Sequence, residues 1–166
     1  MNSKKISGVK DKFSYNGAVV LGLNDALVEI SGALVGLSFA LAESKIIATV
    51  GIITGCAAAL SMAASEYLSA KEDNRKNPFK AATYTGIAYL IAVILLVSPY
   101  FILSNVYHST GIMLILVIAI IAIYTKYDSK IHNESFKSKF FEMFSITLVV
   151  SVISFLFGML VKKMTG

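Results

Sequence analysis

The chain has 166 residues, of which 56% are hydrophobic and only 15% are charged, and its formal net charge is +5. Soluble proteins carry roughly 25% charged residues, so this composition excludes an ordinary soluble domain and predicts an integral membrane protein. The basic residues are divided among three short polar segments without a recognition motif, so we expect no nucleic acid as a partner.

Five apolar runs follow one another along the chain, and each is long enough to cross a bilayer. A helix spans the hydrocarbon core with roughly 20 residues. Membrane strands would alternate apolar and polar residues over about ten positions, whereas these runs are continuously apolar over about twice that length. We therefore predict an all-α membrane protein with a single domain over residues 1–166, whose transmembrane helices cover residues 18–42, 46–70, 81–103, 106–124 and 140–161.

The positions of Lys and Arg predict the orientation of this bundle. Twelve of the fifteen basic residues precede the first helix, join the second to the third, or join the fourth to the fifth. Because positively charged loops stay on the cytoplasmic side, the N-terminus is predicted to be cytoplasmic and the C-terminus to lie on the opposite side. Tyr100 and Tyr107 are then expected at the outer membrane interface, as in other aromatic belts.

Three acidic residues lie inside the predicted spans. Asp25 and Glu29 are four residues apart on one face of the first helix, and Glu66 lies in the second. A carboxylate in hydrocarbon is costly and usually faces a partner, a cavity or an ion, which favours transport as the function. Two structural alternatives stay open: an interhelical hydrogen bond for Asp25, and contact with water at the headgroups for Glu66.

Met62 adds a sulfur ligand to these acids. It is four residues before Glu66, and the rise per residue places both at depths similar to those of Asp25 and Glu29. Carboxylates suit hard divalent cations and a thioether is softer, so the four residues together indicate a borderline metal such as Fe²⁺ or Mn²⁺. Ordinary helix packing is the alternative role for Met62. Buried carboxyl groups favour the protonated form, so we expect metal binding to release protons and to couple transport to a proton gradient.

Small residues form two stripes close to the acids. Gly32 and Gly36 are four apart in the first helix, and Gly51 and Gly55 are four apart in the second. Such stripes let membrane helices approach closely and predict a tight interface. Five helices do not divide into two equal repeats, so any internal symmetry requires a second copy, and we predict a homodimer.

Two segments resemble the vacuolar iron transporter family, which includes yeast-type vacuolar iron and manganese carriers and nodulin-21-like proteins. They are Gly-Leu-Asn-Asp-Ala-Leu-Val at residues 22–28 and the more specific Ala-Leu-Ser-Met-Ala-Ala-Ser-Glu-Tyr-Leu-Ser at residues 59–69. The number of helices, the cytoplasmic N-terminus and the Pro99-Tyr100 pair extend the resemblance over nearly the whole chain. It implies a homodimeric exchanger of protons for Fe²⁺, and often Mn²⁺, with a pathway between the subunits lined by helices one and two.

Within this resemblance, Asp25 matches the family's helix-one acid and Met62 its helix-two methionine, both associated with metal translocation. Glu66 falls in the family's pattern of a small residue, Glu and Tyr. Plant members carry a helix-two acid where this chain has Thr54, so the site has one fewer carboxylate or uses Glu29 instead. The long acidic metal-collecting insert of plant members is absent, because residues 71–80 alone join the two helices.

The resemblance implies transport out of the cytoplasm, into a vacuole in eukaryotes or across the plasma membrane in prokaryotes. The short chain favours a multi-pass protein of a prokaryotic plasma membrane, with metal detoxification by efflux as its function. Two other interpretations are a non-transporting membrane subunit, in which the acids and glycines serve assembly, and a carrier of small organic cations. No nucleophile elbow, phosphate-binding loop or zinc-protease helix is present, so we expect neither an enzyme nor a resident cofactor.

Overall fold

A computed structural model describes the backbone of residues 3–165 and the side chains from Asn16 onward, except those of His132 and Thr165. Each of its helices contains a stretch that is long and apolar enough to cross a membrane, and the described residues form no strand. The predicted all-α membrane fold with five spans is therefore confirmed. The helices are α1 (Ser3–Ala40), α2 (Ser44–Glu72), α3 (Pro78–Ile102), α4 (Val106–His132) and α5 (Phe136–Thr165).

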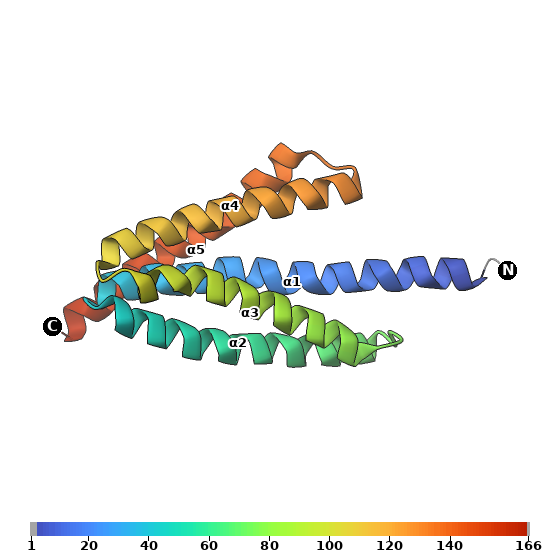
Figure 1. Ribbon diagram of the computed structural model, residues 1–166, viewed down its shortest axis with the longest axis horizontal. Coiled ribbons are helices and arrows are strands. Elements are labelled where there is room, and N and C mark those ends of the chain that lie inside the picture. Colours follow the sequence, from blue (N-terminus) through green and yellow to red (C-terminus); the bar gives the residue numbers. More distant parts are fainter. Residues whose placement is uncertain (1–2, 166) are drawn as a thin grey trace.

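The helices run up and down with short connections (Figure 1). The N-terminus, the α2–α3 connection and the α4–α5 connection lie at one end of the bundle, and the C-terminus lies at the other. We call the first of these the basic end, because most Lys and Arg residues belong to its segments. It is the end that the charge distribution predicts to be cytoplasmic.

The helices extend further into the polar segments than predicted. α1 begins at Ser3 instead of residue 18, α4 continues to His132 instead of residue 124, and α5 begins at Phe136 instead of residue 140. An apolar run marks the part of a helix that lipid covers, whereas the backbone hydrogen bonds continue past that boundary. Only residues 133–135 connect α4 to α5, and Asn133 ends α4 in the left-handed conformation, at φ 58°.

Both glycine stripes pack inside the chain. Gly32 and Gly36 lie against α5, Gly55 lies against α3, and Gly51 lies against both α3 and the Leu34 side chain of α1. The approach is close enough that a Cβ atom on Gly55 would come within 2.4 Å of the Val93 side chain. The predicted tight packing is confirmed, and α1–α5 and α2–α3 are the interfaces that use it. These stripes are therefore already occupied and do not offer a surface for assembly with another protein.

The expected place of Tyr100 at the membrane interface is wrong. Its side chain is fully buried, its hydroxyl lies 2.9 Å from Ser38 Oγ, and it donates a hydrogen bond to Thr110 Oγ1 at 3.1 Å. This network joins α1, α3 and α4 near the end opposite the basic end. A tyrosine near a helix end can be buried when neighbouring helices supply a partner for its hydroxyl, which its own sequence position does not reveal. Tyr107 is 72% exposed, in agreement with the prediction.

Candidate metal site

Asp25 and Glu29 lie together near the middle of the membrane-spanning part of α1. This part covers Asn16–Ala40, and the two acids are close enough in space for their carboxyl groups to interact. The predicted pairing of these two acids on one helical face is therefore present in the structure.

Tyr89 on α3 is the third member of this group. It is fully buried, and its hydroxyl donates a hydrogen bond to Glu29 Oε2 at 2.7 Å. The sequence did not identify this tyrosine as a site residue. A single Tyr in an apolar helix carries no signal of its partner, and the bond joins residues that are 60 positions apart.

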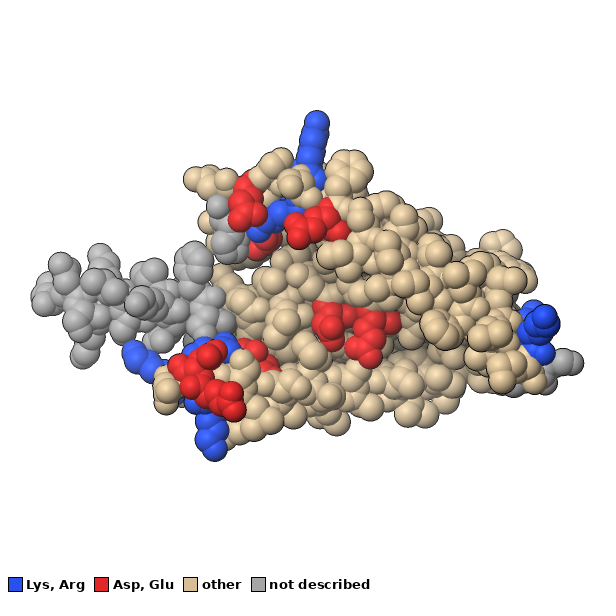
Figure 2. Space-filling model, turned by 180° about the vertical axis from the view of Figure 1, so that it is seen from behind, with Lys and Arg blue, Asp and Glu red and all other residues tan. Residues whose placement is uncertain are grey.

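The acid pair opens onto the surface of the single chain. Glu29 is exposed and Asp25 is half-buried, although both lie within an apolar span. Figure 2 shows an acidic patch in the middle of one face, surrounded by uncharged residues, with the other charged side chains near the ends of the molecule. Carboxyl groups facing acyl chains are strongly unfavourable, so this face requires a polar or ionic cover in the membrane.

Met62 lies on α2 at nearly the same depth as Asp25. The register follows from Gly51, which faces the Leu34 side chain across the antiparallel α1–α2 pair. Because the helices are antiparallel, moving eleven residues forward from Gly51 to Met62 corresponds to moving eleven residues back from Leu34 to Leu23. Met62 is therefore level with Leu23, which is two residues, or about 3 Å along the helix axis, from Asp25. Its side chain is partly buried against the core. The structure thus brings Met62 to the level of the acid pair. It also shows Met62 packed against the core, so the alternative packing role stays open.

Glu66 has a different environment from the acid pair. It is only 6% exposed, and its Oε1 accepts a hydrogen bond from Arg75 Nη1 at 2.8 Å. Arg75 lies in the α2–α3 connection, so the ion pair ties the last turns of α2 to the loop that follows. The partner of Glu66 in this structure is therefore a guanidinium at the basic end.

The described acidic, His and Cys side chains do not cluster into a metal site within one copy of the chain. Among the side chains that the structure describes, no group of three or more His, Cys, Asp and Glu residues is arranged to hold a metal ion. Asp25 and Glu29 supply two carboxyl groups, and Met62 would add one thioether. Divalent metals that bind oxygen ligands usually take about six, so these three groups by themselves would not complete a coordination sphere.

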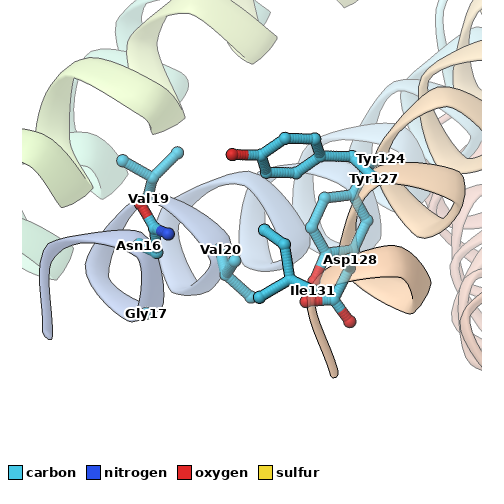
Figure 3. A pocket seen from close by; sticks show the side chains of 8 residues that line it. All are labelled: Asn16, Gly17, Val19, Val20, Tyr124, Tyr127, Asp128 and Ile131. Atoms are coloured by element: carbon cyan, nitrogen blue, oxygen red, sulfur yellow. The ribbon is translucent and has the colours of Figure 1, made fainter. Parts of the chain in front are cut away.

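Two cavities lie between α1 and its neighbours α4 and α5, away from the acid pair. One, of about 340 Å³, is lined on the α4 side by Tyr124, Tyr127, Asp128 and Ile131, which face the first turns of the α1 span (Figure 3). The other, of about 290 Å³, includes Asn24 and the Asp128–Lys139 ion pair. Neither cavity is lined by a candidate metal ligand. They therefore do not extend the candidate metal site.

Comparison with known protein families gives a match that covers most of α1 and all of α2. The family model described as the VIT family matches residues 16–76. The match confirms the predicted vacuolar iron transporter resemblance over this segment, which contains Asp25, Glu29, Met62 and Glu66. No curated protein matches the chain. The VIT family is a family of membrane transporters of metal ions.

Thr54 lies within the segment that matches the VIT family, at the position where the resemblance to plant members places an acid. Its side chain is exposed, and its hydroxyl donates a hydrogen bond to the Val50 carbonyl oxygen of the same helix at 2.8 Å. A hydroxyl carries no charge and this one is bonded to its own backbone, so Thr54 is a poor replacement for a carboxylate ligand. Glu29 is the second carboxylate near Asp25 in this chain.

Proposed function

We propose that this protein exports a divalent transition metal, Fe²⁺ or Mn²⁺, from the cytoplasm in exchange for protons, through a pathway at a homodimer interface. The observation that carries the proposal is the pair of Asp25 and Glu29, exposed near the middle of a membrane span. The VIT-family match over residues 16–76 supports metal transport at the family level. A prokaryotic plasma membrane is the proposed location, with a vacuolar membrane as the alternative.

A second copy of the chain is the proposed cover for the acid pair. Two copies related by a two-fold axis would bring four carboxyl groups and two thioethers to one gap, which suits the coordination of a borderline divalent metal. Ile53, Leu60 and Leu68 of α2 are 64%, 70% and 60% exposed and supply apolar surface for the contact. Helix α2 is otherwise little covered, since only 28% of its apolar 18-residue stretch is buried inside the chain.

Proton exchange follows from the chemistry of the acid pair. Two neighbouring carboxyl groups in an apolar span are more favourable when they hold one proton between them than when both are charged. Metal ligands must be deprotonated, so an arriving dication displaces that proton, and a proton returns when the metal leaves. Alternation between these two forms would couple metal export to proton entry.

Reconstitution of the purified protein into vesicles tests the proposal. Uptake of Fe²⁺, Mn²⁺ and Zn²⁺ is measured with and without a pH gradient, and we expect Fe²⁺ and Mn²⁺ uptake that is faster into vesicles with an acidic lumen. Empty vesicles serve as the control. A folded protein that moves none of these metals would favour a non-transporting membrane subunit. Uptake of amines that Fe²⁺ and Mn²⁺ do not inhibit would instead favour a carrier of organic cations.

A further inference from the structure

Glu29 is open to the surface on one side and held from inside the bundle on the other. The inner contact is Tyr89, whose ring belongs to the buried core that also contains Ala26 of α1 and Ala59 of α2. A tyrosine has few rotatable bonds, and close packing around its ring fixes the position of its hydroxyl. The hydroxyl that donates a hydrogen bond to Glu29 is therefore held by the rigid interior of the bundle.

The bond between these residues orients the carboxylate. The Tyr89 hydroxyl donates to Glu29 Oε2 at a distance of 2.7 Å, which leaves Oε1 free of this bond and available to a cation. A hydrogen bond to an ionised carboxylate is roughly twice as strong as one between neutral groups. The hydroxyl in turn needs Glu29, because a buried donor without a partner is costly. Each group thus holds the other in place.

We propose that Tyr89 is a positioning residue for metal binding, which presents Glu29 as the second carboxylate ligand beside Asp25. This inference rests on the proposed function and adds α3 to a site that the family resemblance assigns to helices one and two. Tyr89 and Glu29 together would compensate for Thr54, whose hydroxyl is bonded to its own helix. The metal site would then be built by three helices of each subunit.

The test is Tyr89→Phe in reconstituted vesicles, which removes the hydroxyl and keeps the ring. We expect the half-saturating concentration of Fe²⁺ or Mn²⁺ to rise about tenfold, with a nearly unchanged maximal rate, because the hydrogen bond to a charged ligand is lost. Tyr100→Phe is the matched control. Tyr100 is equally buried on the same helix, but its hydroxyl faces Ser38 and Thr110 instead of an acid. This control should keep the wild-type half-saturating concentration.

The Tyr89→Phe substitution made in a Glu29→Gln variant shows whether Tyr89 acts through Glu29. Glu29→Gln removes the charge and keeps an acceptor, so adding Tyr89→Phe to it should change the half-saturating concentration little further, as expected for coupled residues. If Tyr89→Phe does not insert into the membrane, Glu29→Asp withdraws the carboxylate from the hydroxyl and should raise the half-saturating concentration in the same way.

The outcomes separate this inference from the proposed function. Metal uptake by the wild-type protein with an unchanged half-saturating concentration in Tyr89→Phe, or in Glu29→Asp where that variant replaces it, overturns the role of Tyr89 alone. Equal effects of Tyr89→Phe and Tyr100→Phe also overturn it, because they indicate a general packing defect. An absence of metal uptake by the folded wild-type protein overturns the proposed function itself, and this inference with it.

Discussion

Gly22 of α1 lies so close to Thr85 of α3 that a Cβ atom on the glycine would come within 2.2 Å of the threonine carbonyl oxygen. The Thr85 hydroxyl also donates a hydrogen bond to the Ala18 carbonyl oxygen at 2.9 Å. The two contacts fix α1 against α3 immediately before the turn that carries Asp25. They also bring the helices near enough for Tyr89 to reach Glu29 further along the same pair.

Gly22→Ala should therefore reduce stability and metal transport together. The new methyl group would meet backbone atoms that move only if α3 moves, and overpacking of this kind typically costs about 1–3 kcal/mol. The thermal unfolding midpoint of the purified protein in detergent measures the effect. Gly17→Ala is the matched control, because a Cβ at Gly17 has no atom within 4 Å among the described residues. Equal destabilisation by both substitutions would contradict the close approach at Gly22.

The five spans were predictable because apolar length and loop charge follow directly from the requirements of a bilayer. The acid pair was predictable as well, since four-residue spacing places Asp25 and Glu29 on one face of a helix. The depth of the two acids in the membrane could be calculated from the rise per residue of a helix. Each of these features is a property of a single helix, and the periodicity of a sequence describes single helices.

The neighbours of each helix were not predictable in the same way. Lipid is as apolar as a leucine side chain, so the apolar faces of a membrane helix do not reveal whether they contact protein or acyl chains. The Tyr89–Glu29 hydrogen bond depends on the packing of α3 against α1, and the Glu66–Arg75 ion pair depends on how the chain folds back after α2. Glycine stripes indicated close packing but did not indicate which helix would use it.

Asp25→Asn should remove most metal transport while the protein still folds and inserts into the membrane. The amide keeps the size and the hydrogen-bonding capacity of the side chain but loses the charge that a dication requires. We expect the rate at low metal concentration to fall by about tenfold or more, since interactions of charged groups are worth ~1.5–3 kcal/mol. Glu43→Gln is the control, because Glu43 is exposed in the turn between α1 and α2. A wild-type rate in Asp25→Asn would remove Asp25 from the metal pathway.

Met62→Leu should alter metal preference more than stability. The exchange of Met for Leu nearly conserves volume and typically costs less than about 1.5 kcal/mol, so the fold should survive. A thioether favours softer metals, so its loss should weaken transport of Fe²⁺ relative to Mn²⁺ in a competition assay. Met113→Leu removes a fully buried methionine of α4 and should leave the ratio of the two metals unchanged. An unchanged ratio in Met62→Leu would assign Met62 to packing alone.

Arg75→Gln should destabilise the protein, because it leaves the buried Glu66 without its cation. Removing one partner of a buried ion pair typically costs about 3–5 kcal/mol, and Arg75 is 28% exposed, so we expect a value near the lower end. The double substitution Glu66→Gln and Arg75→Gln removes both charges and should recover much of the loss. The thermal unfolding midpoints of the three variants, which include Glu66→Gln alone, measure this coupling.

The same variants show whether Glu66 also binds the transported metal. If its role is to pair with Arg75, the double variant should keep a half-saturating metal concentration close to that of the wild-type protein. The buried ion pair leads us to expect this result, because a metal ligand at this position would have to displace the guanidinium first. An increase in the half-saturating concentration as large as that in Asp25→Asn would instead place Glu66 among the metal ligands.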